Sequence, residues 1–216
     1  MSAETDSYHH PELKARLLET ARLELAQMGV RNFSLRAVAG RAGVSRTAPY
    51  RHFEGRDGLL GALTAQGFLE LTAALREADA GCPGSSLDKL LAQGSAYLDF
   101  GRRRPELLEL IFSNQGILAV MKDASIGRSP PSADYDAFGV LEARVAACQA
   151  EGILSLGLPP YMVATLVWST VHGLSTLERE GVLGHMAVER GLAPEAAANT
   201  ILGALRGLYL GPDLNS

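Results

Sequence analysis

The chain has 216 residues, of which 47% are hydrophobic and 20% charged, and its formal net charge is −4. This length predicts one large domain, or a small domain joined to a larger one, with enough core to need no disulfide or metal staple. The same numbers exclude collagen-like, disordered and disulfide-scaffold proteins. The mild acidity also argues against a nucleic-acid partner, although a sum hides where the charges lie.

Composition favours an all-α fold, because 34 Leu and 31 Ala stand against only 11 Val and 5 Ile. Cys82 and Cys148 form no C-x-x-C pair, so we expect two reduced cysteines. No apolar run approaches the roughly 20 residues of a membrane span. The first ten residues are polar and acidic, unlike a signal peptide. We therefore expect a cytoplasmic protein without a membrane partner.

Four helices are predicted in the first third of the chain. They cover residues 11–28, 35–42 and 45–52, and a longer one follows Gly55. Gly29 ends the first, Ser34 caps the second, and Ser45 caps the third. A loop is expected at residues 81–86.

Five further helices bring the expected total to about nine. Their predicted ranges are about 87–102, 105–113, 133–154, 159–180 and 194–210. Pro159 and Pro194 suit first turns of helices. Residues 122–132 contain one glycine and two prolines and are expected to form a mobile loop.

Positive charge is concentrated between residues 31 and 56. This segment holds six arginines and one acid, Glu54, for a local net charge of +5. Basic side chains that neutralise phosphates release counterions, which dominates affinity for DNA. The distribution of charge along the chain therefore favours a nucleic-acid partner, although the net charge argues against one.

The basic segment also has the layout of a helix-turn-helix, with Gly43 and Val44 as its turn. The second helix of such a unit reads base edges in the major groove with its first residues. Arg46 suits guanine and Thr47 suits thymine. The residues expected to be exposed near the start of this helix, where DNA is read, are Ser45, Arg46, Thr47 and Tyr50. The residues better placed to contact phosphates are Arg51, His52 and Arg56.

Pro49 complicates this reading helix. Proline removes a backbone donor, and the residue before it is biased away from helical geometry. The helix is therefore expected to be distorted, or to begin one or two residues after Ser45.

The segment from Phe33 to Phe53 reads FSLRAVAGRAGVSRTAPYRHF, and RDGLL follows at Arg56. It closely resembles the DNA-binding region of the tetracycline-repressor (TetR) family. The resemblance implies a homodimeric, ligand-responsive transcription factor, usually a repressor. By position it implies phosphate contacts at Ser34, Tyr50, His52 and Arg56, although lysine is the usual cation where Arg56 stands.

The resemblance divides the chain into a helix-turn-helix domain, residues 1–58 and ordered from about residue 11, and an effector-binding and dimerisation domain, residues 59–216. In the latter, Trp168, His172 and Gly173 resemble the Trp-His-Gly element of one class of TetR-like C-terminal domains. Trp168 and His172 share a helix face, where they either pack in the core or line an effector cavity. The other candidates for a largely apolar cavity are Tyr97, Phe100, Ile111, Phe112 and Met121.

The last two long helices are candidates for a dimer interface. Gly203, Gly207 and Gly211 recur every fourth residue, which lets helices approach closely. A seam on the preceding helix contains Val163, Val167, Thr170, Leu174 and Leu177. Packing within one protomer remains the alternative for these residues.

The expected function is a dimeric repressor that a small molecule releases from a palindromic DNA operator. The alternatives are an activator or ligand-blind regulator of the same fold and, more remotely, an all-α enzyme. Against the enzyme, the chain has no G-x-S-x-G, phosphate-loop or H-E-x-x-H motif. No cofactor or metal is expected.

Overall fold

The computed structural model describes residues 4–113, 135–154, 157–191 and 193–209. Its α-helices are α1 (Glu4–Asn32), α2 (Leu35–Arg41), α3 (Gly55–Gly81), α4 (Ser86–Arg103), α5 (Pro105–Phe112), α7 (Ala137–Ala150), α8 (Pro160–Arg179), α9 (Val182–Val188) and α10 (Ala197–Tyr209). Two 3-10 helices are η1 (Ala48–Arg51) and η3 (Pro194–Ala196). No strand occurs among these described residues, and the predicted all-α fold class is confirmed.

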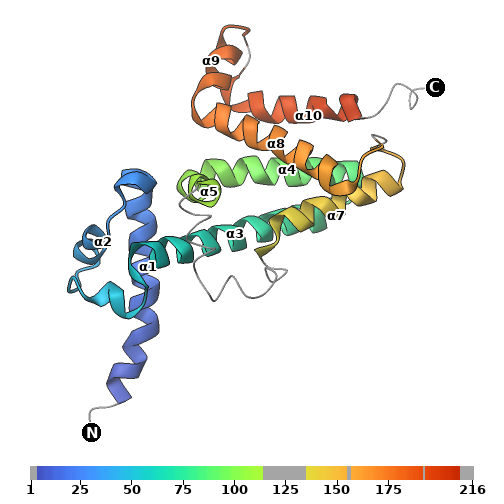
Figure 1. Ribbon diagram of the computed structural model, residues 1–216. Coiled ribbons are helices and arrows are strands. Elements are labelled where there is room, and N and C mark those ends of the chain that lie inside the picture. The colour runs from blue at the N-terminus through green and yellow to red at the C-terminus, as the bar shows by residue number, and fades with distance from the viewer. Residues whose placement is uncertain (1–3, 114–134, 155–156, 192, 210–216) are drawn as a thin grey trace. The chain divides into compact units, whose positions relative to one another are not determined.

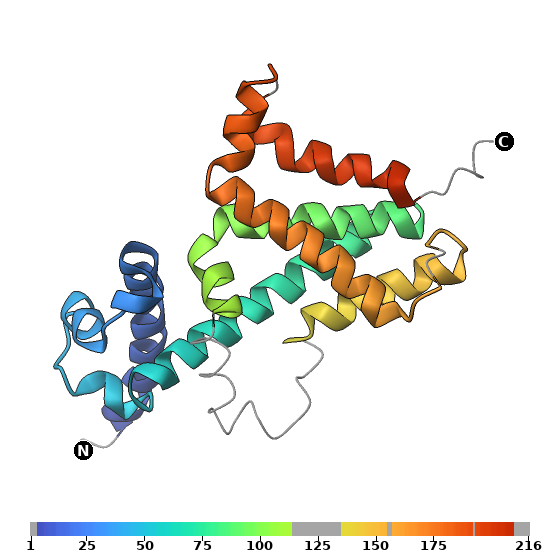
Figure 2. The ribbon, with the colours of Figure 1, turned by 45° about the horizontal axis from the view of Figure 1, so that its top comes forward.

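The helices form two compact units. The first contains the described parts of residues 1–68 and 105–132, so it holds α1, α2, η1, α5 and the first part of α3. In this unit α1 packs against α2 and α5 (Figure 2). Its buried core comprises Leu17, Ala21, Leu25, Val30, Phe33, Leu35, Val38, Phe53, Leu59, Leu60, Leu63 and Leu110.

The second unit contains the described parts of residues 69–104 and 133–216. There α4 packs against α7, α8 and α10, and α8 also packs against α7 and α9 (Figure 1). One buried cluster comprises Leu87, Leu90, Leu141, Val145, Cys148, Leu154, Val163 and Ala164. Cys82 and Cys148 are both free, and burial raises the pKa of Cys148 to about 11, so that thiol stays protonated.

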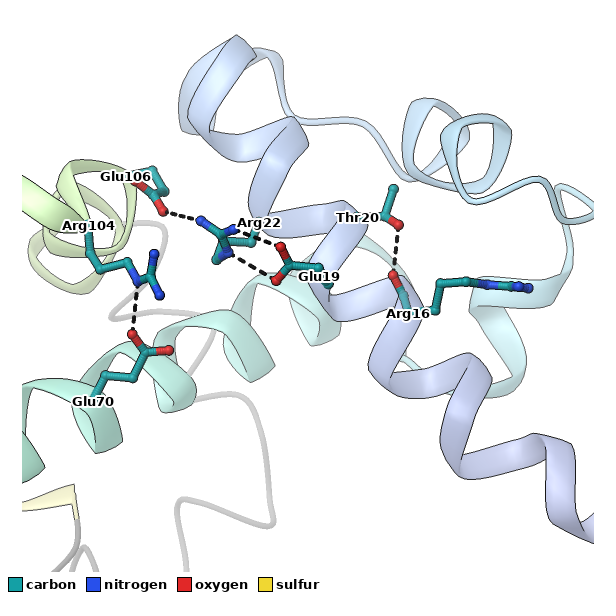
Figure 3. Close-up of polar contacts among 7 residues, drawn as sticks. All are labelled: Arg16, Glu19, Thr20, Arg22, Glu70, Arg104 and Glu106. Atoms are coloured by element: carbon teal, nitrogen blue, oxygen red, sulfur yellow. Dashed lines mark hydrogen bonds and ion pairs between the residues drawn. The ribbon is translucent and has the colours of Figure 1, made fainter.

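Ion pairs tie helices together within each unit (Figure 3). In the first unit, Arg22 of α1 lies 2.7 Å from Glu19 on its own helix and 3.0 Å from Glu106 of α5. Only 7% of the Glu106 side chain is exposed, so this pair fastens α5 to α1. In the second unit, Arg104 lies 3.1 Å from Glu70 of α3.

Several helix limits differ from the predicted ones. The first helix begins at Glu4, seven residues before Pro11, whereas its predicted break at Gly29 is confirmed by a φ of 69° there. The segment predicted as 133–154 is α-helical only over α7 among its described residues. Helix α9 was not predicted, since its seven residues show little periodicity and follow directly on α8 after the left-handed Gly181. The loop predicted over 122–132 lies outside the described residues.

Helix α3 runs through both units. By length and composition it could cross a membrane, with a hydropathy of 1.3 over its most apolar window, although the sequence showed no apolar run of that length. Half of that window is buried inside the protein, which is typical of a core helix. The predicted domain boundary at residue 58 falls inside α3, and that boundary stays a prediction.

Candidate functional site

A tight turn at Gly43 joins α2 to the segment that leads to η1. Gly43 has a φ of 68°, and its N–H bonds to the carbonyl of Gly40 at 3.2 Å. The next N–H, of Val44, bonds to the carbonyl of Ala39 at 3.0 Å. This pair of bonds is a Schellman helix ending, in which glycine supplies the left-handed residue. Val44 packs against the core of the first unit, so the turn is held on its apolar side.

The predicted reading helix over 45–52 is the short 3-10 helix η1 in the structure. Pro49 explains the difference, since an α-helix beginning at Ser45 would lose its first backbone bond there. The chain instead makes hydrogen bonds between residues three positions apart, such as the 3.0 Å bond from the N–H of Ala48 to the carbonyl of Ser45. The expected distortion is therefore observed, as a 3-10 helix that begins only at Ala48.

Side chains around η1 divide into a buried and an exposed set. Ala48, Pro49 and Phe53 are buried and anchor the segment in the core. Tyr50 is 62% exposed, which leaves a large ring open to solvent. The exposed set comprises Ser45, Arg46, Thr47, Tyr50 and Arg51. The predicted reading residues thus all lie at the surface of one short segment.

Two other predicted phosphate contacts lie partly buried beside this segment. Ser34 occupies the N-cap position of α2, but its hydroxyl makes no capping hydrogen bond. His52 follows η1, and its ring centroid lies 6.3 Å from that of Phe53. Ser34 therefore occupies the N-cap position, but its hydroxyl does not cap the helix.

Arg56 is engaged within the protein. Its Nε donates to the carbonyl of Phe33 at 3.1 Å, and its Nη2 donates to that of Val30 at 2.5 Å. The guanidinium also lies 6.0 Å from the centroid of the Phe33 ring. These contacts fasten the end of α1 to the start of α3 and satisfy carbonyls that a helix end leaves unbonded. About a third of the side chain, 34%, remains exposed.

The arginines of residues 31–56 fall into two groups. Arg41 lies 3.1 Å from the buried carboxylate of Glu24 and donates to Gln27, so its charge is used within the first unit like the guanidinium of Arg56. The other four are exposed and make no side-chain hydrogen bond or ion pair with any described residue: Arg31, Arg36, Arg46 and Arg51. Arg36, on α2, was not singled out from the sequence, although it belongs to the same basic cluster.

Three predicted effector-pocket residues meet in the second unit. The indole Nε1 of Trp168 donates to the hydroxyl of Tyr97 at 3.4 Å, and that hydroxyl lies 2.8 Å from Nδ1 of His172. Since the phenol oxygen accepts from the indole, its own proton is free to bond Nδ1, which places the imidazole proton on Nε2. Burial lowers the pKa of His172, and the charge of Arg179 adds to this effect, so the imidazole stays neutral.

This chain of hydrogen bonds favours the core-packing interpretation of Trp168 and His172. Tyr97 is only 4% exposed, and burial raises its pKa. Phe100 is buried in the same unit, whereas Ile111 and Phe112 belong to the first unit. Met121 lies outside the described residues. A cavity lined by all these residues stays a prediction.

The predicted interface residues on α8 and α10 differ in exposure. Val163 is fully buried in the core of the protomer, Leu174 is 7% exposed, and Val167 and Thr170 are half-buried. Gly203 and Gly207 are exposed, and a Cβ added at either would meet no atom within 4 Å. Gly211 lies outside the described residues. Leu177, the last residue of the predicted seam, is exposed, as are Met162, Leu166 and Ser169 on the same helix.

Sequence comparison assigns both parts of the chain to one family. The model for bacterial regulatory proteins of the tetR family matches residues 17–63, which include α2 and η1. The model for the tetracyclin repressor-like C-terminal domain matches residues 90–204, more than half of the 216-residue chain. No functionally curated protein matches the chain.

Solved structures share the fold over almost the whole chain. A protein of unknown function from Rhodococcus sp. RHA1 is 29% identical, with a TM-score of 0.71 over 94% of this chain and 96% of its own. The TetR family transcriptional regulator PfmR from Thermus thermophilus is 15% identical, with a TM-score of 0.60 over 90% and 97%. The fatty acid degradation regulator FadR from Bacillus halodurans is 13% identical, with a TM-score of 0.65 over 93% and 96%.

The matches bear on function as well as on fold. The matched N-terminal model covers the helix-turn-helix described above, and the matched C-terminal model covers most of the second unit. The Trp-His-Gly class of the C-terminal half is not confirmed by them. The chain is a DNA-binding transcriptional regulator rather than an enzyme, and it belongs to the tetracycline repressor (TetR) family.

Proposed function

We propose that this regulator is a cytoplasmic homodimer that represses transcription from a palindromic operator and is released by a small-molecule effector. The observation that carries the proposal is the surface around η1. There Arg46 and Arg51 are exposed, make no ion pair with described residues, and lie beside the exposed Thr47 and Tyr50. Unneutralised guanidinium groups next to a rigid turn suit a polyanion with readable edges.

Within this surface, Arg46 and Thr47 read bases, since they precede η1 at the end that enters the groove. Ser34, Tyr50, Arg51 and His52 contact phosphates, which position the unit without specifying sequence. Ser45 lies 3.1 Å from Thr47, hydroxyl to hydroxyl, and holds the orientation of that side chain. Arg36 supplies a further phosphate contact from α2.

Arg56 has a mixed role in this proposal. Its bonds to the carbonyls of Val30 and Phe33 position the start of α3, while its exposed part faces a phosphate. The backbone N–H groups at the start of a helix add to such a contact.

The dimer forms through α8 and α10. Val163 and Leu174 are buried in the protomer core, so they are not available to a partner. The proposed interface on α8 is instead formed by exposed side chains at helical spacing, Met162, Leu166, Ser169 and Leu177. The open glycines Gly203 and Gly207 let a partner helix approach α10 closely. A two-fold axis then places the two reading units about 34 Å apart, one turn of DNA.

Release follows if the effector prefers a conformation in which the two reading units no longer match the operator. A ligand with equal affinity for both conformations would shift nothing. The proposed effector site lies within the second unit, among residues that the C-terminal family model matches.

The test begins with selection of operator sequences from random or genomic DNA by the full chain. A palindromic site with two half-sites about 10 base pairs apart is expected, bound by a species whose mass is that of two chains in analytical ultracentrifugation. Leu166→Glu should yield monomers with weak operator binding, whereas Val188→Glu on the exposed part of α9 should not. A monomer that binds a single non-palindromic site would overturn the dimeric proposal.

Footprinting with and without a metabolite library then tests regulation. Protection that a ligand releases, together with reporter expression that rises when the ligand is added, supports repression and induction. Protection that no ligand changes indicates a ligand-blind regulator, and reporter expression that requires the bound protein indicates an activator.

A further inference from the structure

A buried carboxylate joins α1 to α2 in the first unit, where these two helices pack together (Figure 2). Glu24 of α1 is 4% exposed, and among the described residues it is the only acidic one in the buried core. Burying a carboxylate is costly unless it is paired. The fold therefore has to bring a cation to Glu24, and that cation comes from α2.

Arg41, the last residue of α2, supplies this partner. Its Nη2 lies 3.1 Å from Oε2 of Glu24 and donates to Oε1 of Gln27 at 2.7 Å. Glu24 and Gln27 are three residues apart on α1 and so lie on one face of that helix. The guanidinium of Arg41 is thus held by two acceptors of α1, although 39% of its side chain remains exposed.

Helix α2 has little local stabilisation of its own. It has seven residues, about two turns, and isolated helices of that length are not stable in water. The hydroxyl of Ser34 does not cap its start, and Gly40 lies in its last turn. The placement of α2 therefore depends on its contacts with the rest of the unit.

These contacts are of two kinds. Leu35, Val38 and Ala39 are buried, and burial of apolar surface has no directional preference. Such contacts hold α2 on the core but resist a small rotation about its axis only weakly. A charge-assisted hydrogen bond requires a defined geometry, so the two contacts of Arg41 oppose that rotation at the end of α2.

The end of α2 is also the start of the reading turn. Arg41 stands two residues before Gly43, and the N–H groups of Gly43 and Val44 both bond to carbonyls of α2. A rotation of the last turn of α2 would therefore carry the turn with it. Arg46 and Thr47, which follow the turn, would then be displaced as well.

We propose that Glu24 is a positioning residue for DNA recognition. It does not touch DNA. It acts through Arg41 to fix the end of α2, and so fixes the direction from which Arg46 and Thr47 approach the bases. The effect on operator recognition rests on the function proposed above, whereas the effect on α2 does not.

Two substitutions of Glu24 separate this role from packing. Leucine has a similar volume without charge, and an apolar residue in place of a buried ion-pair partner commonly preserves stability. Glutamine keeps an acceptor oxygen for Arg41. The matched control is Glu19→Leu, since Glu19 is an acid of the same helix that pairs with Arg22 of α1 instead of with α2. Thermal unfolding checks that each variant is folded.

The first readout is the ratio of the Kd for a non-specific duplex to the Kd for the operator, measured by fluorescence anisotropy. Glu24→Leu should lower this ratio about tenfold, the discrimination that one base pair supplies. Glu24→Gln should lower it less, and Glu19→Leu should leave it unchanged. A role in stability alone would lower the Tm and leave the ratio of the folded protein as in the wild type, and that result would overturn the proposal.

A double variant tests whether Glu24 acts through Arg41. Glu24→Leu combined with Arg41→Met removes both partners and leaves no unpaired buried charge. Because both residues serve one contact, the double variant should have the same ratio as Glu24→Leu alone. A further fall would mean that Arg41 contributes to recognition independently of Glu24, which contradicts the proposal.

The second readout needs no DNA. Exchange of the amide hydrogens of Gly43 and Val44 with solvent should be about tenfold faster in Glu24→Leu than in the wild type, and unchanged in Glu19→Leu. Faster exchange in a chain that selects no operator would uphold the positioning of α2 while the proposed function fails. Strong operator binding by the wild type, with exchange and ratio both unchanged in Glu24→Leu, would uphold the proposed function and overturn the role of Glu24.

Discussion

The two units differ in how many of their arginines are paired with carboxylates. In the second unit most described arginines lie against carboxylates, as in the pairs Arg102–Glu178, Arg104–Glu70, Arg144–Asp79, Arg179–Glu180 and Arg206–Asp88. In the first unit, Arg31, Arg36, Arg46 and Arg51 have no such partner among the described residues. The difference separates arginines that join helices from arginines whose charge is available to phosphate.

The first unit also shows that proximity in sequence does not settle the role of an arginine. Arg41 and Arg46 are five residues apart in the same basic cluster, yet Arg41 binds Glu24 and Arg46 points to solvent. Arg56 falls between the two classes, since it bonds to backbone carbonyls and is still one-third exposed. Substitutions in each class test whether the exposed arginines bind DNA and the paired ones stabilise the fold.

The largest effect is expected for the double substitution of Arg46 and Arg51 by alanine. Operator affinity should fall by about 100-fold or more, because phosphate and base contacts are both lost. The slope of the logarithm of the binding constant against the logarithm of salt concentration should become shallower by about one to two. Arg46→Ala alone should also relax preference at one base position of each half-site.

Fluorescence anisotropy at several salt concentrations measures these changes, and thermal unfolding should be unaffected. Arg190→Ala, which removes an exposed arginine of the second unit, is the control and should leave operator affinity unchanged. If the double variant bound the operator as tightly as the wild type, this surface would not be the one that binds DNA.

Arg144→Ala should show the opposite pattern. Its side chain and that of Asp79 are 19% and 23% exposed, so loss of the guanidinium leaves a largely buried carboxylate without its main partner. We expect a loss of about 2 kcal/mol in the free energy of unfolding, measured by urea denaturation. The exposed pair of Arg179 and Glu180 provides the matched control, for which Arg179→Ala should cost below about 0.5 kcal/mol. Equal costs for both variants would contradict the division by burial.

Arg56 is expected to affect stability and DNA binding together, each by about 1 kcal/mol. Arg56→Ala removes two hydrogen bonds to backbone carbonyls as well as a charge. Arg56→Lys keeps the charge but lacks the planar fork, so it should restore DNA affinity more fully than stability. If lysine restored both to the same extent, the bonds to Val30 and Phe33 would have no separate structural role.

Features encoded within a few residues were predictable from the sequence. The breaks at Gly29 and Gly43 follow from local backbone preference, and Pro49 correctly indicated a distorted reading helix. The basic cluster and the motif around it were sufficient to identify the DNA-binding unit.

Features that depend on distant neighbours were not predictable. Helix α8 has apolar residues on more than one face, so periodicity alone did not reveal that Val163 faces the protomer core and Leu166 faces solvent. The network of Asp79, Gln93 and Arg144 joins three helices, and no spacing along the chain indicates it.

The smallest effect concerns the exposed pair of Asp88 and Arg206, which joins α4 to α10. Hydrogen bonds from Ser85, followed by that from Arg206, lower the pKa of Asp88 from 3.8 to about 2. Since the folded pKa lies below the unfolded one, the stabilisation is complete above about pH 4 and is lost as the pH falls toward 2. The difference in Tm between the wild type and Asp88→Asn should therefore be constant from pH 7 to about pH 4.5 and shrink below pH 4. Because the pair is exposed, it should also shrink in high salt, unlike the difference produced by Arg144→Ala. A Tm difference that persisted unchanged at pH 3 would mean that the charge of Asp88 contributes neither to its hydrogen bonds with Ser85 nor to its pair with Arg206.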